Sequence, residues 1–270
     1  MSLKAKIRNI ANDKNISAQV VLQNYMFERF LERLSLSEYR DKFIIKGGIL
    51  IAAHVGISNR STMDLDATIK NYEVNTKSIE KAVKEISKIQ LDDNVEFIYR
   101  GTSSIREDDE YGWLRISVEA IYYTIITPLQ IDITTGDVIT PKEVILPYKM
   151  IFDDKDIEVL AYNIESVLAE KVETIIRRGQ YSTRPRDFYD IYILSKIKKY
   201  NKNIFSEALI KTAEHRKTEY IFNDLEKRVG NIERSIELEK RWIKYTKDYP
   251  YSKGISYESI IKKLKELLEL

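Results

Sequence analysis

The segment Arg60-Ser61-Thr62-Met63-Asp64-Leu65-Asp66, which follows Lys46-Gly47-Gly48 and a short apolar stretch, is the most informative part of the chain. Residues 63–69 alternate between apolar and polar side chains, as strands do. Asp64 and Asp66 therefore point to one face of the predicted strand. Two adjacent carboxylates repel each other, and a bridging Mg²⁺ or Mn²⁺ relieves that repulsion. The pair predicts divalent metal and phosphoryl chemistry, although turns also contain many Asp-x-Asp sequences.

A third carboxylate lies further along the chain, in Leu129-Gln130-Ile131-Asp132-Ile133. The apolar residues of this predicted strand face one way and Asp132 faces the other. With the first pair it could hold two metals roughly 3.5 to 4 Å apart, which would activate a hydroxyl and stabilise a leaving pyrophosphate. The alternative is that Asp132 merely precedes a turn at the rim of a sheet.

The two glycines before the acidic pair have a separate significance. Gly47 and Gly48 open a predicted apolar helix over residues 48–55, where backbone N–H groups can bind phosphate oxygens. Arg60 and Thr62 flank this point and could supply a cation and a hydroxyl. A bare Gly-Gly is usually just a turn, but here it precedes the carboxylates in the order that a nucleoside triphosphate site needs.

Charged residues of the C-terminal half form a second group of candidate site residues. Lys171 falls within the apolar stripe of a predicted helix over residues 164–178, where it either extends to solvent or reaches phosphates, with about equal odds. Asp187 and Asp190 share one helical face through their i, i+3 spacing. The alternative for these two carboxylates is an acidic pair that stabilises the start of a helix.

The pattern along the chain predicts an N-terminal α/β domain over residues 1–150 and a mainly helical domain over residues 151–270. Two helices are expected within residues 3–34, with Ser17 as an N-cap. Further helices are expected over residues 76–89 and from Asn163 to Arg178, and the chain after Arg186 reads as helical. Strands are expected over residues 63–69, 95–100, 113–123, 129–134 and 157–162.

Composition narrows the class of protein. The hydrophobic content of 43% is enough for a buried core, and the absence of Cys excludes disulfides, thiolate zinc sites and a cysteine nucleophile. The two histidines, His54 and His215, lie outside any metal-ligand spacing and are interpreted as structural. The chain has no run of 18 apolar residues and no signal-peptide pattern at its start. We expect a cytoplasmic protein without a membrane segment.

The formal net charge of +2 hides an asymmetry along the chain. From Lys196 to the end there are 18 Lys and Arg residues against 12 Asp and Glu, whereas the preceding part has 26 against 30. The excess of positive charge is compatible with contacts to a nucleic-acid backbone. Most charged segments, however, are merely solvated faces.

Taken together, the motifs of this chain and their order along the sequence resemble those of the AbiEii/AbiGii-type nucleotidyltransferase toxins. These toxins belong to type IV toxin–antitoxin and abortive-infection systems. The resemblance covers roughly residues 40 to 195. It is carried by five motifs beyond the opening glycines: residues 60–66, the charged segment 105–111, residues 130–137, Leu168-Ala169-Glu170-Lys171, and residues 186–192. Each motif alone is loose, but the ordered set is specific.

The resemblance implies a polymerase-β-like nucleotidyltransferase core with a mixed sheet and N-terminal helices, joined to a mainly helical domain. It implies transfer of a nucleotide from an NTP to an acceptor, in some relatives the 3′ end of tRNA. Asp64 and Asp66 would be metal ligands, and Asp132 the third acidic residue. Lys171 would match the essential lysine of the family, and Asp187 the acid of its last motif, with Asp190 as the alternative for that role.

One departure concerns the glycines. The wider superfamily has Gly-Ser where this chain has Gly47-Gly48, so no serine hydroxyl can hold the triphosphate there, and Thr62 is expected to compensate.

The favoured hypothesis is a metal-dependent transferase that moves a nucleoside monophosphate to an acceptor, expected to be RNA, and acts as a toxin with a cognate antitoxin encoded nearby. Two alternatives stay open. One is a catalytically silent module that binds RNA or protein, and the other is a metal-dependent phosphohydrolase.

Overall fold

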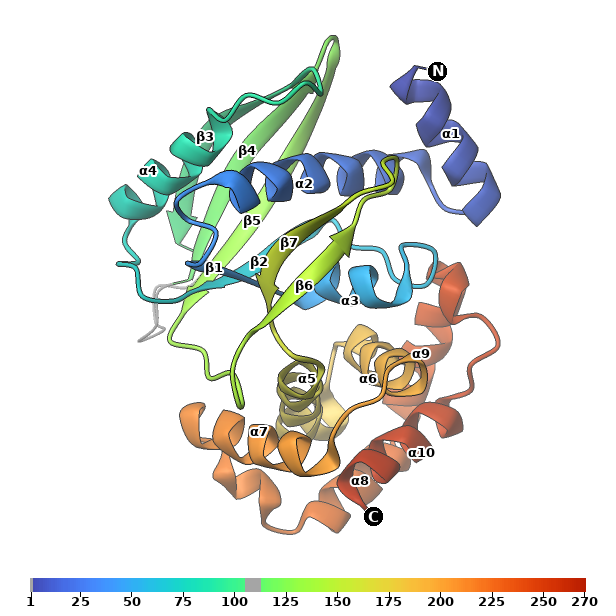
Figure 1. Cartoon of the computed structure of the whole chain (residues 1–270). Helices are drawn as coiled ribbons and strands as arrows, with labels where there is room; N and C mark the ends of the chain where they lie inside the picture. The colour runs from blue at the N-terminus through green and yellow to red at the C-terminus, as the bar shows by residue number, and fades with distance from the viewer. Residues whose placement is uncertain (1, 105–112) are drawn as a thin grey trace. The chain divides into compact units, whose positions relative to one another are not determined.

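The computed structural model describes residues 2–104 and 113–270. They form two compact units, one made of the chain up to Asp137 with Glu143–Tyr162, and the other of Val138–Lys142 with Asn163–Leu270 (Figure 1). The charged motif predicted over residues 105–111 lies outside the described residues. Each unit is described by itself below.

The first unit is built on a mixed sheet with the strand order β3-β4-β5-β2-β1-β7-β6. Strand β5 runs parallel to β2, and β7 runs parallel to β1, whereas the other neighbours are antiparallel. The strands are β1 (Phe43–Lys46), β2 (Asp64–Ile69), β3 (Val95–Ser104), β4 (Leu114–Tyr122), β5 (Ile125–Thr135), β6 (Val144–Lys149) and β7 (Asp156–Ala161). The predicted α/β core with a mixed sheet is confirmed.

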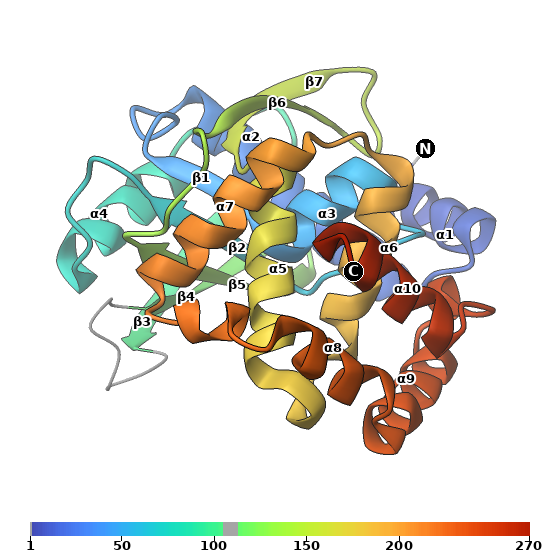
Figure 2. The same cartoon turned by 90° about the horizontal axis from the view of Figure 1, so that it is seen from below.

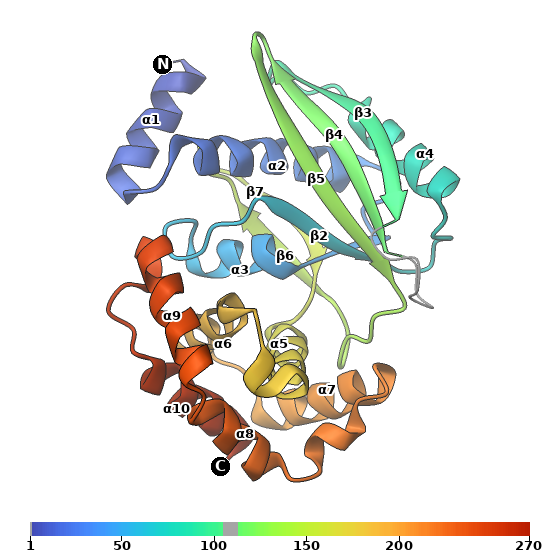
Figure 3. The same cartoon turned by 180° about the vertical axis from the view of Figure 1, so that it is seen from behind.

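One face of this sheet is apolar because the central strands alternate. Leu65, Ile116 and Ile131 are at most 1% exposed, while the polar residues between them point to the other face. Helix α2 (Ala18–Leu36) crosses one face of the sheet (Figures 1 and 3). Phe30 of α2 packs edge-on against Phe97 of β3, with ring centroids 5.6 Å apart. Burial against helices therefore leaves the opposite face for polar side chains.

Three further helices belong to this unit: α1 (Leu3–Lys14), α3 (Gly47–Val55) and α4 (Thr76–Ser87). The predicted pair of N-terminal helices is confirmed, and the Ser17 hydroxyl accepts a hydrogen bond from the Val20 N–H at 3.2 Å, as expected for an N-cap. α3 packs against β1 and β2.

Two strands of the sheet were not predicted. β1 has four residues, all buried, so it shows no alternation of polar and apolar side chains. β6 contains Pro147, which is tolerated because β6 is an edge strand. Residue 150, the predicted domain boundary, follows β6, and the chain leaves the first unit after Tyr162.

The second unit is helical, and Figure 2 shows its helices most openly. They are α5 (Ile164–Arg178), α6 (Pro185–Ile197), α7 (Lys202–His215), α8 (Leu225–Glu233), α9 (Ile236–Asp248) and α10 (Tyr257–Leu268), with short 3₁₀ turns over Gly179–Tyr181, Glu219–Phe222 and Pro250–Ser252. The predicted apolar stripe of α5 is buried, since Leu168, Val172 and Ile175 are fully inaccessible. Within the described part of the chain, no helix combines the length and the apolar character needed to cross a membrane.

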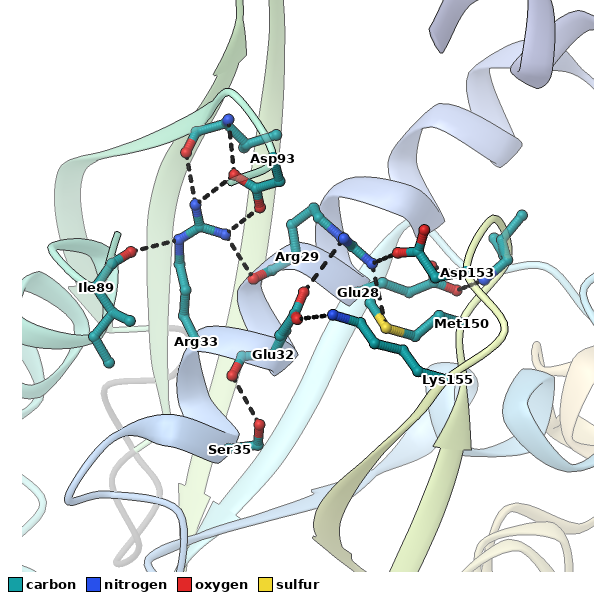
Figure 4. Close-up of polar contacts among 12 residues, drawn as sticks. Glu28, Arg29, Glu32, Arg33, Ser35, Ile89, Asp93, Met150, Asp153 and Lys155 are labelled. Carbon is teal, nitrogen blue, oxygen red and sulfur yellow. Dashed lines mark hydrogen bonds and ion pairs between the residues drawn. The ribbon is translucent and has the colours of Figure 1, made fainter. Parts of the chain in front are cut away.

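A buried polar network fastens α2 to the segment before β3 (Figure 4). The guanidinium of Arg33, which is 1% exposed, forms a two-pronged ion pair with Asp93, with N–O distances of 2.7 and 2.9 Å. It also donates to the carbonyls of Arg29, Ile89 and Val95 at 2.7 to 3.0 Å. Because each N–H group of this guanidinium has an acceptor, the pair offsets the cost of burying two charges.

One turn earlier, Glu28 lies in the same network, 1% exposed. Burial raises the pKa of its carboxyl group to about 8, and the Ile151 N–H and the Arg29 guanidinium oppose that rise only in part. The Ile151 N–H contacts both carboxyl oxygens, at 3.1 and 3.0 Å. Glu28 is therefore largely protonated at neutral pH.

The ion pair makes a first prediction. Asp93→Ala should lower the free energy of unfolding by about 3 to 5 kcal/mol, because it leaves the Arg33 charge buried without its partner. Urea unfolding followed by circular dichroism measures the change. As a control, Lys84→Ala removes an exposed ion pair with Glu80 on α4 and should leave the unfolding midpoint nearly unchanged. Equal effects of the two substitutions would show that the buried pair does not hold α2 in place.

The second prediction concerns pH. The pKa of Glu28 is about 8 in the folded protein and near 4.5 when unfolded, so the folded state holds the proton more tightly. Its contribution to stability is complete below about pH 4.5 and is lost as pH rises through about 8. Glu28→Gln cannot ionise, so its stability relative to the wild type should increase by a few kcal/mol between pH 5 and pH 9. A constant difference between the two unfolding curves would contradict this prediction.

Candidate active site

The three predicted carboxylates lie together on the polar face of the sheet. Asp66 of β2 is directly opposite Asp132 of β5, and Asp64 is directly opposite Gln130. Side chains of directly opposite residues project from the same face of a sheet. β5 lies between β4 and β2, so Asp132 is inside the sheet and not at its rim. The alternative that Asp132 merely precedes a turn at the rim of the sheet does not account for this position between two strands.

Arg115 is a site residue that the sequence analysis missed. It lies on β4 directly opposite Asp132, and its Nε and Nη2 atoms donate to the two carboxylate oxygens at 2.7 and 2.6 Å. The ion pair with Asp132, with a smaller effect of Asp64 and Asp66, raises the pKa of Arg115 above its ordinary value. The alternation of β4 places residue 115 on the polar face, but only the register between strands identifies its partner.

The glycines begin helix α3, as predicted, and they lie against the acidic pair. A Cβ on Gly47 would be 1.9 Å from the Asp66 Oδ2 atom, and Gly47 has a positive φ of 65°. The Gly48 N–H donates to the same oxygen at 3.4 Å. A side chain at Gly48 would come within 2.6 Å of the Thr62 hydroxyl. Both glycines are thus required by the close approach of α3 to the start of β2.

The two flanking residues are buried beside this turn. Thr62 is 5% exposed, and its hydroxyl donates to the Asp64 carbonyl at 3.2 Å and accepts from the Asp64 N–H at 3.4 Å. Arg60 is 2% exposed and donates to the Ser61 carbonyl. A Cβ on Gly48 would be 3.2 Å from its Nη2 atom. Their roles in nucleotide binding stay predictions.

A second ion pair fixes the residue that precedes the glycines. The Lys46 ammonium lies 2.5 Å from Asp137, which also accepts from the Thr134 hydroxyl at 2.6 Å. Burial alone would raise the pKa of Asp137, but the charge and hydrogen bond of Lys46, together with the threonine hydroxyls, lower it to about 2. The Lys46 ammonium also lies over the rings of Trp113 and Tyr162. These contacts hold the end of β1 in place just before Gly47.

In the second unit, Lys171 of α5 meets both carboxylates of α6. Its Nζ atom lies 2.6 Å from Asp187 and 3.0 Å from Asp190. The two carboxylates are 6% and 0% exposed, and the Lys171 side chain is 20% exposed. The predicted shared face of Asp187 and Asp190 is confirmed, because both contact one ammonium. The lysine in the apolar stripe is therefore neutralised by buried acids.

The donor atoms of the first unit fit a hard divalent cation. Carboxylate oxygens are the ligands that Mg²⁺ and Mn²⁺ prefer, and the pairing of β2 with β5 brings three carboxylates to one face of the sheet. Among residues 2–104 and 113–270, no three His, Asp or Glu side chains already converge on one metal position. In this structure both oxygens of Asp132 are bound by Arg115.

Comparison with solved structures finds chains of low sequence identity, of which two are described here. JHP933 from Helicobacter pylori has 15% sequence identity and a TM-score of 0.48, with 86% of this chain and 95% of that chain covered. An antigenic nucleotidyltransferase-like protein from Paracoccidioides brasiliensis has 14% identity and a TM-score of 0.41, with 87% and 92% covered. No curated protein sequence matches the chain.

A family model provides the decisive comparison. The model described as nucleotidyl transferase AbiEii toxin, type IV TA system, matches residues 29–263, which include both groups of site residues. The sequence resemblance is therefore confirmed. With its acidic site on a mixed sheet, the chain belongs to the AbiEii family of toxins of type IV toxin–antitoxin systems and is a nucleotidyltransferase.

Proposed function

We propose that this nucleotidyltransferase moves a nucleoside monophosphate from an NTP to an RNA acceptor, such as the 3′ end of a tRNA, with the help of Mg²⁺ or Mn²⁺. One observation carries the proposal: Asp66 and Asp132 are directly opposite each other on parallel strands, with Asp64 on the same face. Crowded carboxylates of this kind favour a divalent cation. The family match supports nucleotide transfer as the reaction.

Asp64, Asp66 and Asp132 are the proposed metal ligands. A bound divalent cation supplies positive charge that activates the attacking hydroxyl and stabilises the leaving group. In the transfer, the acceptor hydroxyl oxygen forms a bond to the α-phosphorus of the NTP. The bond between that phosphorus and the oxygen that bridges to the β-phosphate breaks, and pyrophosphate leaves with the electron pair. The hydroxyl proton is released to water.

The remaining site residues are proposed to bind the nucleotide. Backbone N–H groups at the start of α3, at Gly47 and Gly48, suit the negative charge of a triphosphate. Arg60 and Thr62 lie beside them and could add a cation and a hydroxyl. Lys171 is proposed as a catalytic residue, the counterpart of the essential lysine of the family.

In the second unit, Asp187 is proposed as the acid that holds the Lys171 ammonium, and Asp190 has the alternative or supporting role. This assignment follows the family pattern and the contacts within the second unit.

The RNA acceptor is supported by charge. The chain from Lys196 onward has 18 Lys and Arg residues against 12 Asp and Glu, and all of its helices belong to the second unit. An excess of positive side chains favours binding to the phosphate backbone of RNA. As a member of a type IV toxin family, the protein is expected to have a cognate antitoxin that counteracts it in the cytoplasm.

A transfer assay tests the proposal. The protein is incubated with Mg²⁺, each labelled NTP in turn, and either total RNA or a protein extract. Label should appear in RNA, and Asp66→Asn should reduce it at least about 100-fold, because the substitution removes a carboxylate that the proposed divalent cation needs as a ligand. Asp41→Asn, at an exposed carboxylate, is the matched control and should transfer normally.

Other outcomes of this assay identify the competing functions. Phosphate release without any labelled acceptor would identify a phosphohydrolase. Absence of transfer, together with absence of metal-dependent NTP binding in calorimetry, would identify a silent binding module. Label in protein and not in RNA would overturn the RNA acceptor while leaving the transferase intact.

A further prediction concerns the turn at Gly47 and Gly48. Gly47→Ala should abolish transfer, because the new Cβ would collide with the Asp66 carboxylate. Gly179→Ala is a matched control, since Gly179 also has a positive φ, of 53°, but nothing lies within 4 Å of its Cβ position. Both variants place a side chain at a positive φ, which costs about 1 to 3 kcal/mol of stability, and Gly47→Ala adds the collision with Asp66. Normal transfer by Gly47→Ala would show that the position of Asp66 against the turn is not needed.

A further inference from the structure

Arg115 forms an ion pair with Asp132, the carboxylate that β5 contributes to the site. Its guanidinium binds both oxygens of Asp132 in a two-pronged arrangement, with N–O distances of 2.7 and 2.6 Å. Paired N–H donors in this geometry are among the stronger side-chain interactions in proteins. In this arrangement each Asp132 oxygen already has a cationic partner.

The position of Arg115 follows from the sheet register. Asp66, Asp132 and Arg115 are successive partners across β2, β5 and β4, so their side chains stand in one row on the polar face. Asp66 and Asp132 repel each other, and the guanidinium at the end of the row offsets that repulsion. At the opposite end of the row, Lys46 is directed to Asp137 instead.

Asp132 and Arg115 differ in how freely their side chains can move. The Asp132 side chain is 11% exposed and belongs to a strand with neighbours on both sides. The Arg115 side chain is 41% exposed and is long enough to turn into water. If a second cation competes for Asp132, the guanidinium is the partner that can leave.

We propose that Arg115 is a positioning residue that exchanges with the divalent cation on Asp132, so that the third carboxylate becomes a metal ligand only when the guanidinium leaves. This inference rests on the proposed metal dependence of the site. Before the metal arrives, Arg115 keeps the carboxylates from repelling one another. Its departure is a cost that lowers the affinity for the metal.

Binding of Mn²⁺ alone, followed by electron paramagnetic resonance without NTP or RNA, tests the exchange independently of turnover. Arg115→Gln should bind Mn²⁺ about tenfold more tightly than the wild type, because no ion pair has to break. Arg115→Lys keeps the charge but cannot hold both oxygens, so its affinity should lie between the two. Arg100→Gln, which removes an exposed arginine bound to Glu119 on the neighbouring strands, should bind as the wild type does.

A double variant separates exchange from a general effect of charge. In an Asp132→Asn background, Arg115→Gln should bring no gain in Mn²⁺ affinity, because the contested carboxylate is absent. The same tenfold gain in that background would overturn the proposal, as would equal or weaker binding by Arg115→Gln. If either of these contradicting results were obtained while the protein still carried out Mg²⁺-dependent transfer, the proposed role of Arg115 would be wrong and the proposed function would stand. Absence of Mn²⁺ binding in the wild type and in Arg115→Gln would overturn the exchange and the metal dependence together.

Discussion

The repulsion between Asp66 and Asp132 is the constraint on which the rest of this site depends. The parallel pairing of β2 with β5 places these carboxylates directly opposite each other. The pairing is maintained by the buried residues that alternate with them, such as Leu65 and Ile131, which are at most 1% exposed. The sheet thus uses apolar burial on one face to keep like charges together on the other, where a cation is needed.

Both units handle concentrated negative charge in the same way, with a basic side chain from a neighbouring element. Arg115 neutralises Asp132 in the sheet, and Lys171 neutralises Asp187 and Asp190 between two helices. Burial by itself favours the protonated form of an acid. Glu28 shows this effect, because burial raises its pKa to about 8.

The cost of this arrangement is offset elsewhere in the first unit. Arg33 and Asp93 join α2 to the chain just before β3, and every N–H group of the guanidinium is used (Figure 4). α2 in turn covers the apolar side of the sheet through contacts such as that of Phe30 with Phe97. A rigid support of this kind keeps the polar face in register, which a site for nucleotide transfer requires.

The pattern of the sequence by itself determined the α/β core, the helical second half and the shared strand face of Asp64 and Asp66, because the periods of strands and helices are local properties. The position of Asp132 on that same face of the sheet depends on the register of β2 with β5. Strands β1 and β6 could not be predicted, since one is buried on both faces and the other is an edge strand with Pro147. Only the tertiary structure decided that Arg115 holds Asp132, that Lys46 holds Asp137 and that Gly47 must lack a side chain. These contacts depend on strand register and on the packing of α3, which join residues far apart in the chain and leave no periodic signal in it.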